Sequence, residues 1–229
     1  RDSCSIYMEL PKGQVIPMLS RDKGHVAFET FSPINIWGTP AIRMMAVYRT
    51  VGCAYDKERK GCAMCNFAAH ADPDVTESDI LQQHKMVLDQ LKYSKVKQFD
   101  LLTPGNYFND GEISPELQVA LLSSLAKIDT LRRVLVESRV AYVSEDRLRR
   151  AKAALRSDQI LEYVFGYESI TARIRNQVLN KGVKESHLDK ALRYCSESKI
   201  DFVAYILIKP QTLKEEEAIA EAVNSALHV

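Results

Sequence analysis

Short apolar runs alternate with amphipathic stretches along most of the chain. Apolar runs rich in β-branched and aromatic residues predict five strands, at 44–52, 97–103, 132–138, 160–169 and 201–208. Stretches in which apolar residues recur every three to four positions predict helices between and after them, at 76–94, 114–128, 144–155, 170–182, 184–198 and 213–227. Apolar strands that alternate with amphipathic helices are typical of a parallel sheet with outer helices, so the fold class is α/β.

Capping residues support several of these helices. Thr76 is placed to cap the first helix, and Ser114 the second, where Pro115 occupies the first turn. Gly182 is placed to end the helix predicted at 170–182.

The two ends of the chain differ from this pattern. Residues 1–43 are irregular and are interpreted as a lead-in, and residues 44–229 as one core domain. The last amphipathic stretch stops without a capping glycine or a following strand. We therefore expect a core that is incomplete after its fifth strand-helix unit.

Composition limits the kind of partner and compartment. The 229 residues are 46% hydrophobic and 27% charged, which predicts a soluble globular protein. A net charge of +1 gives no overall basic footprint for nucleic acid or for an anionic membrane. No apolar run is long enough to span a bilayer, and the first residues lack the apolar core of a signal peptide. The expected location is the cytoplasm, with no membrane partner.

Three of the five cysteines, Cys53, Cys62 and Cys65, lie within thirteen residues, directly after the first predicted strand. Thiols stay reduced in the cytoplasm, so a cluster of this kind indicates metal binding more than disulfides. Cys4 and Cys195 stand apart and are interpreted as dispensable thiols.

Three thiolates suit zinc or an iron-sulfur cluster. A zinc knuckle would use Cys62, Cys65 and His70, but its fourth ligand position is occupied by Val75, so a more distant residue would have to supply that ligand. A 4Fe-4S cluster held by three cysteines keeps one iron open for another molecule. A zinc-stabilised binding module without catalysis therefore remains the alternative to a catalytic cluster.

The cysteine loop, closed by Cys-x-x-Cys with Met64 before its last cysteine, resembles that of the radical S-adenosylmethionine (radical SAM) superfamily. Eight residues separate Cys53 from Cys62, where the commonest spacing has three. This longer interval resembles the branch that contains the Elongator catalytic subunit and the radical SAM subunit of archaeosine synthase. The segments "LLTPGNYFNDGEI", "VLVESR", "VFGYES" and "NKG" resemble later segments of that branch, in the same order.

The resemblance implies a partial TIM-type (βα)6 barrel in which the three cysteines bind a 4Fe-4S cluster and SAM binds its open iron. It also implies that SAM contacts come from residues at or near the ends of the predicted strands. Those residues are Met64, Thr103, Gly105, Asn106, Glu137, Arg139, Glu168, Ser169 and Lys209. Ordinary turn, core or ion-pair roles remain the alternatives for each of them.

The activity that the resemblance implies is reductive cleavage of SAM to a 5'-deoxyadenosyl radical that abstracts hydrogen from a substrate. The substrate would be a modified tRNA nucleoside or a small-molecule or peptide intermediate. An external one-electron donor of the flavodoxin or ferredoxin type is expected, and a partner subunit is possible.

Overall fold

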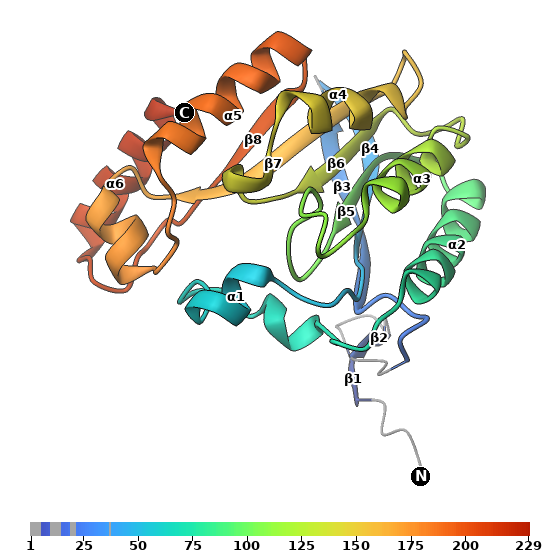
Figure 1. Ribbon diagram of the computed structural model, residues 1–229, viewed down its shortest axis with the longest axis horizontal. Coiled ribbons are helices and arrows are strands. Elements are labelled where there is room, and N and C mark those ends of the chain that lie inside the picture. Colours follow the sequence, from blue (N-terminus) through green and yellow to red (C-terminus); the bar gives the residue numbers. More distant parts are fainter. Residues whose placement is uncertain (1–5, 10–14, 19–21, 37) are drawn as a thin grey trace.

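A six-stranded mixed sheet forms the centre of the molecule (Figure 1). The computed structural model describes residues 6–9, 15–18, 22–36 and 38–229, and Cys4 lies outside these ranges. The strands of the sheet, in spatial order, are β3 (Phe28–Ile36), β4 (Thr39–Val47), β5 (Val96–Leu102), β6 (Arg133–Glu137), β7 (Ile160–Glu168) and β8 (Asp201–Ile206). Strands β4 to β8 are parallel neighbours, and β3 pairs antiparallel with β4.

Helices follow the parallel strands in turn. They are α1 (Ala54–Arg59), α2 (Glu77–Tyr93), α3 (Pro115–Leu125), α4 (Glu145–Ala153), α5 (Glu185–Ser198) and α6 (Glu215–His228). Short 3-10 turns occur at Phe67–His70 and Val140–Tyr142, and a π-helical turn at Ile174–Val178. A separate hairpin pairs β1 (Ile6–Glu9) with β2 (Val15–Met18).

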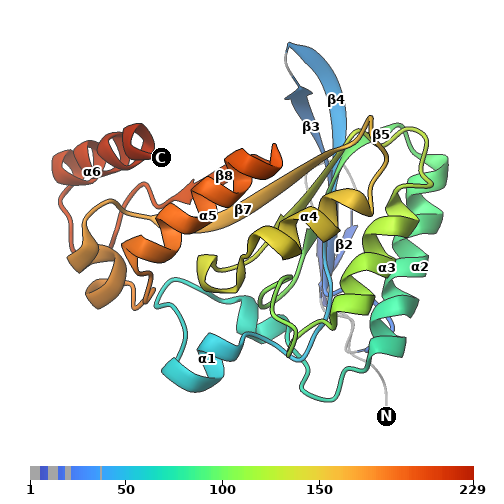
Figure 2. The same cartoon turned by 45° about the horizontal axis from the view of Figure 1, so that its top comes forward.

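The sheet is curled into a half-barrel, and helices α2 to α5 cover its outer face (Figure 2). Helix α1 instead lies at the carboxyl ends of the parallel strands, as Figure 1 shows. The predicted α/β class, with a parallel sheet and outer helices, is therefore observed. None of the helices in the described ranges is long and apolar enough to cross a membrane.

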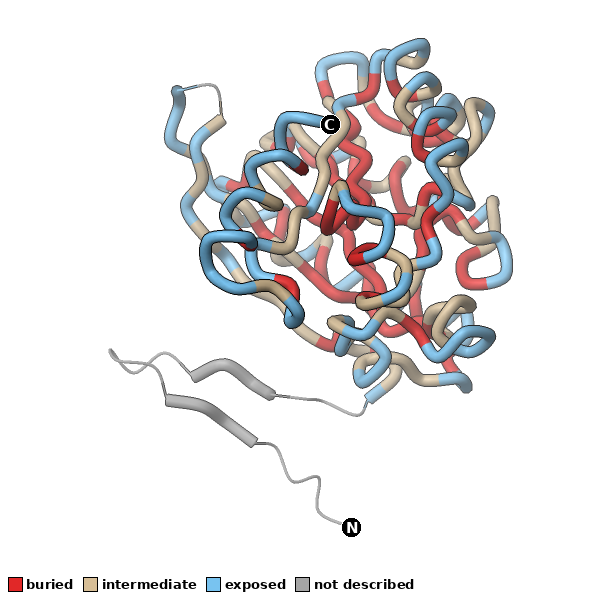
Figure 3. The backbone as a smooth tube through the Cα atoms, turned by 90° about the vertical axis from the view of Figure 1, so that its left-hand side faces the viewer, coloured by how far each residue is buried: buried red, intermediate tan, exposed pale blue. Residues whose placement is uncertain are grey.

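Side chains alternate between the two faces of the strands, and each face has its own buried cluster. Phe99 and Leu101 of β5 belong to the large cluster that packs the sheet against the helices, with Leu91 of α2. Leu102 and Leu135 belong to a smaller cluster on the other face. Figure 3 shows the buried positions gathered in the centre of the molecule and the exposed ones on its outer turns.

The predicted caps form at two helices. The Thr76 hydroxyl accepts a hydrogen bond from Asp79 N, and the Asp79 carboxylate accepts one from Thr76 N, which completes a capping box at α2. Ser114 Oγ accepts from Leu117 N at the start of α3.

Two segments differ from the sequence prediction. The lead-in contains β3 and the first residues of β4, which together form a long hairpin. The helix predicted at 170–182 is shorter than expected: helical residues run from 172 to 178, the last five as a π-helical turn. Gly182 lies three residues beyond the cap at Leu179, so it does not end this helix. The intervening Asn180 has a left-handed φ of 48° and donates to the Gly61 carbonyl at 2.7 Å, a contact with the cysteine loop that local periodicity does not encode.

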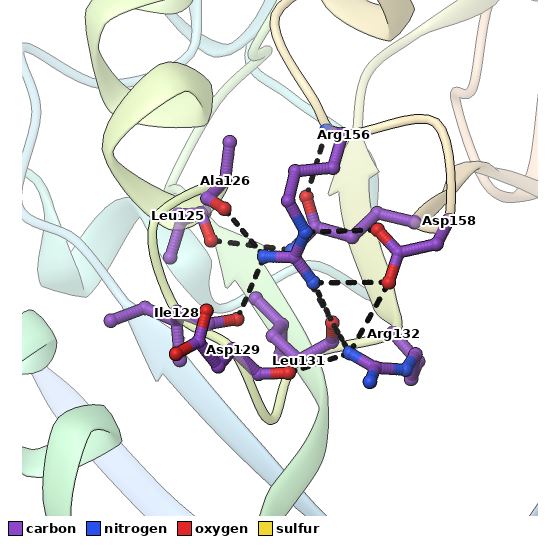
Figure 4. Close-up of polar contacts among 9 residues, drawn as sticks. Leu125, Ala126, Ile128, Asp129, Leu131, Arg132, Arg156 and Asp158 are labelled. Atoms are coloured by element: carbon purple, nitrogen blue, oxygen red, sulfur yellow. Dashed lines mark hydrogen bonds and ion pairs between the residues drawn. The ribbon is translucent and has the colours of Figure 1, made fainter.

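Arg156 joins the loops at the amino-terminal end of the sheet (Figure 4). Its guanidinium donates to the carbonyl oxygens of Ala126, Ile128 and Leu131 and pairs with Asp158. These contacts tie the segment before β6 to the segment before β7. They lie at the end of the sheet opposite the candidate site.

Candidate functional site

A cavity of about 210 Å³ lies at the carboxyl ends of the parallel strands. Its walls come from the cysteine loop after β4, the turn after β5, the ends of β6 and β7, the 181–183 loop and β8. The candidate residues that line it are Cys53, Cys62, Met64, Cys65, Gly105, Asn106, Glu137, Arg139 and Glu168. Most of the residues selected from the sequence therefore share one cavity, and their individual roles stay predictions.

Among the described residues, none of the three clustered cysteines forms a disulfide. Burial raises the pKa of the Cys53 thiol, although Asn106 Nδ2, at 3.5 Å from its Sγ, opposes that rise. Burial also raises the pKa of the Cys62 thiol, against the nearby positive charges of Lys181 and Arg139. Arg139 Nη1 lies 3.7 Å from Cys62 Sγ.

These donors matter for the kind of group that the cysteines could hold. Among the described residues, no three His, Cys, Asp or Glu side chains are close enough together to hold one metal ion. In a 4Fe-4S cluster each cysteine binds a different iron, so its thiolates need not converge on one point. Hydrogen-bond donors beside ligand sulfurs are a usual outer shell of such clusters. Three thiols on one cavity, two of them with such donors, fit this group.

The cysteine loop is held directly against the 179–182 segment. Arg139 stacks on the Tyr55 ring at 3.7 Å and donates to the Lys181 carbonyl at 2.5 Å. The Tyr55 hydroxyl donates to the Asn180 carbonyl, and Ala63 N donates to the Leu179 carbonyl. Contacts within the protein thus already engage Arg139, which the resemblance assigns to SAM.

Acidic side chains lie at the ends of β6 and β7, and both line the cavity. Burial raises the pKa of Glu137 from 4.5 to about 7, with Lys181 lowering it and Glu168 raising it further. Glu168 accepts from Lys181 Nζ at 2.8 Å. Its φ of 67° is a left-handed conformation that is costly for a residue with a side chain, and such strain tends to occur at functional sites.

Gly166 leaves the space in which this ion pair forms. A Cβ at this position would meet the Glu168 carboxylate and the end of the Lys181 side chain, and would lie 3.2 Å from Lys181 Cε. Any larger residue there would therefore displace Lys181 or Glu168.

Three of the selected strand-end residues do not line the cavity. The Thr103 hydroxyl accepts from Gly105 N within the turn after β5. Ser169 is buried and donates to Glu221 of α6 at 2.5 Å. Lys209 is exposed and pairs with Glu215.

The remaining cysteine and histidine candidates also lie elsewhere. His70 does not line the cavity, and its ring packs edge-on against Phe67. Cys195 is buried in α5, where burial raises the pKa of its thiol to about 12, which is consistent with an unreactive thiol.

Two charged residues near the cysteines were not identified from the sequence. Lys181 belongs to the "NKG" segment, but its reach to Glu168 depends on how the loop folds back. Glu112 lies within the "LLTPGNYFNDGEI" segment, and its carboxylate is buried beside the cysteine loop. The one signal for Glu112 in the sequence is a carboxylate in a short turn-rich segment.

Comparisons with known proteins give distant relatives. No family model matches the chain. The chain is 31% identical over 207 residues to an uncharacterized protein of Methanocaldococcus jannaschii, an alignment that covers 85% of this chain and 56% of the relative.

Two further relatives are named archaeosine synthase subunit beta. The chain is 25% identical over 190 residues to the protein of Methanosarcina acetivorans, covering 82% of this chain and 54% of the relative. It is 25% identical over 199 residues to the protein of Thermococcus kodakarensis, an alignment that covers 84% of this chain and 60% of the relative. The chain thus spans little more than half the length of the curated relatives it matches.

Among solved structures, the chain is similar to the radical SAM methyltransferase TsrM of Kitasatospora setae, which was solved with cobalamin and a 4Fe-4S cluster bound. The TM-score is 0.49 at 14% identity, over 80% of this chain and 34% of that one.

Proposed function

We propose that this protein is a radical SAM enzyme whose partial (βα)6 barrel holds a 4Fe-4S cluster on Cys53, Cys62 and Cys65. The observation that carries the proposal is the position of these cysteines: all three line one cavity at the carboxyl ends of parallel strands, where ligands bind in such folds. A bound cluster would supply one electron for the cleavage of SAM to methionine and a 5'-deoxyadenosyl radical.

The cavity residues would bind SAM and shield the reaction from water. The turn of Gly105 and Asn106 borders the cysteine loop, and the SAM ammonium is assigned to this turn. The Asn106 side chain itself bonds within the protein, to Glu112, Cys53 and Arg139. Glu137 and Glu168, at the ends of β6 and β7, offer acceptors for ammonium or ribose hydroxyl groups. Lys181, paired with Glu168, supplies a positive charge suited to a carboxylate.

The name that two relatives share supports a modified nucleoside as the substrate and a second subunit as a partner. We therefore place a tRNA nucleoside ahead of a small-molecule or peptide intermediate. A net charge of +1 gives this chain little general attraction for phosphate, so a partner or a further domain would supply much of the grip on tRNA.

The test is anaerobic reconstitution with iron and sulfide, followed by iron analysis and absorbance. The parent should bind about four irons and absorb broadly at about 400 nm. The variants Cys53→Ala, Cys62→Ala and Cys65→Ala should each lose the cluster, while the matched control Cys195→Ala should keep it. A full cluster in any of the three variants would overturn the ligand assignment. A colourless protein that takes up zinc would instead favour the binding module.

A further inference from the structure

The carboxylate of Glu112 accepts hydrogen bonds from groups in two loops that border the candidate site. Glu112 precedes α3, and its residue is 7% exposed. Its Oε1 accepts from Ala54 N at 2.9 Å, from Asn106 Nδ2 at 2.8 Å and from Asn109 Nδ2 at 2.8 Å. Its Oε2 accepts from Asn106 N. Burial of a carboxylate is costly unless donors of this kind surround it.

We propose that Glu112 is a positioning residue, which fixes the first cysteine of the candidate site through the backbone that follows it. Ala54 is the next residue after Cys53, so its bond to Glu112 restrains the chain beside that cysteine. Asn106, held by the same carboxylate, donates from Nδ2 toward Cys53 Sγ at 3.5 Å. The proposal rests on the proposed function in one respect, which is that Cys53 is a cluster ligand.

Asn106 extends this network to a third strand end. Its Oδ1 accepts from Arg139 N at 2.9 Å, and Arg139 in turn lies beside Cys62. The loops after β4, β5 and β6 are therefore connected through one carboxylate and one amide. Such connections fix the orientation of ligand-bearing residues more firmly than their own loops would.

Both oxygens of Glu112 are needed, because N–H donors face each of them. Glutamine has nearly the same shape, but one of its two positions is an NH2 group, which would face another donor. Glu112→Gln therefore removes hydrogen bonds without creating a cavity. Gly105→Ala would displace the same carboxylate, because its Cβ would meet Glu112 Oε2. That Cβ would also lie 3.1 Å from Cys53 Cα, so this variant disturbs Cys53 directly as well.

The experiment uses the metal-free protein and measures two local properties. Hydrogen exchange followed by peptide mass spectrometry reports on residues 53–59, and site-resolved alkylation with iodoacetamide compares Cys53 with Cys65. In Glu112→Gln and in Gly105→Ala, exchange of 53–59 and the Cys53:Cys65 alkylation ratio should each rise about tenfold, the loss expected for one charge-assisted hydrogen bond. Exchange in β5 and β6 should not change.

Glu116→Gln is the matched control, because Glu116 is an exposed carboxylate on α3, four residues away. It should behave as the parent does. Gly105→Ala keeps the Glu112 charge, so a rise in both test variants cannot come from the loss of that charge alone.

Parent-like exchange and alkylation in Glu112→Gln would overturn the proposal whatever Gly105→Ala shows, because the Cβ added at Gly105 also contacts Cys53 directly. A uniform rise across the sheet and all cysteines would also overturn it, because that result indicates a general loss of stability. Failure of the parent to take up iron would refute the proposed function and leave this metal-free test unaffected.

Discussion

Replacing Glu137 by glutamine should stabilise the protein at pH 8 much more than at pH 5. Burial raises the pKa of this carboxyl group from 4.5 to about 7, because the charged form loses water at the end of β6 and lies near Glu168. Between pH 4.5 and about pH 7, Glu137 is protonated more often in the folded state than in the unfolded state. The contribution of Glu137 to stability is therefore fully present below pH 4.5 and is lost as the pH rises to about 7.

The size of the effect follows from the shift. A shift of 2.5 units from 4.5 to about 7 corresponds to about 3 kcal/mol in total. Between pH 5 and pH 8 the parent should lose about 2 to 3 kcal/mol of this contribution. Glutamine does not titrate, so Glu137→Gln avoids that loss and keeps the side-chain volume.

The assay is guanidinium denaturation of the metal-free parent and Glu137→Gln at pH 5 and pH 8. The measured quantity is the difference in unfolding free energy between the two proteins, compared at pH 5 and at pH 8. The contributions of other titrating groups are the same in both proteins and cancel. Glu116→Gln, an exposed site, should show no such change. An equal difference at both pH values, or a Glu137→Gln protein less stable than the parent at pH 8, would refute the reasoning.

Other predictions concern groups far from the cavity. His84 is buried between the Tyr48 hydroxyl at 2.7 Å and Ser124 Oγ, and burial lowers its pKa from 6.5 to about 4. The parent should therefore lose up to about 3 kcal/mol of its free energy of unfolding as the pH falls from 6.5 to 4. His84→Gln should not show this loss in denaturation curves. Arg156→Met should lower the free energy of unfolding by about 2 kcal/mol, because buried loop carbonyls lose a donor. Arg149→Met, which removes an exposed ion pair on α4, is its control and should change stability little.

Local signals in the sequence were sufficient for most of the helices and parallel strands. Periodicity and the caps at Thr76 and Ser114 identify α2 and α3, and both caps are confirmed. The β3–β4 hairpin was missed, because a proline in the sequence argues against a strand. In the structure β3 runs through Pro33, which pairs with Ile42. The helix predicted at 170–182 ends earlier than predicted, because Asn180 has a left-handed φ and is held by carbonyls of the distant cysteine loop.

In the candidate site, too, the sequence predicts the residues at strand ends but not those whose position depends on how loops fold back. Parallel strands end at one edge of a sheet, so Glu137, Arg139 and Glu168 could be expected to meet, and all three line the cavity. Ser169 was expected at the same site but does not line the cavity. The left-handed φ of Glu168 changes the chain direction, and the Ser169 hydroxyl donates to Glu221 of α6 instead. Glu112 could not be identified, since no periodicity tells where a loop side chain reaches.

The most direct test of the proposed function is the product that the reconstituted protein forms from SAM. Parent protein with a verified cluster is incubated anaerobically with SAM and dithionite, and the nucleosides are separated by chromatography. We predict 5'-deoxyadenosine above the level of a control without reductant, and none above that level in Cys62→Ala. S-adenosylhomocysteine as the sole product, or unreacted SAM alone in parent protein shown to bind both cluster and SAM, would contradict a radical SAM function.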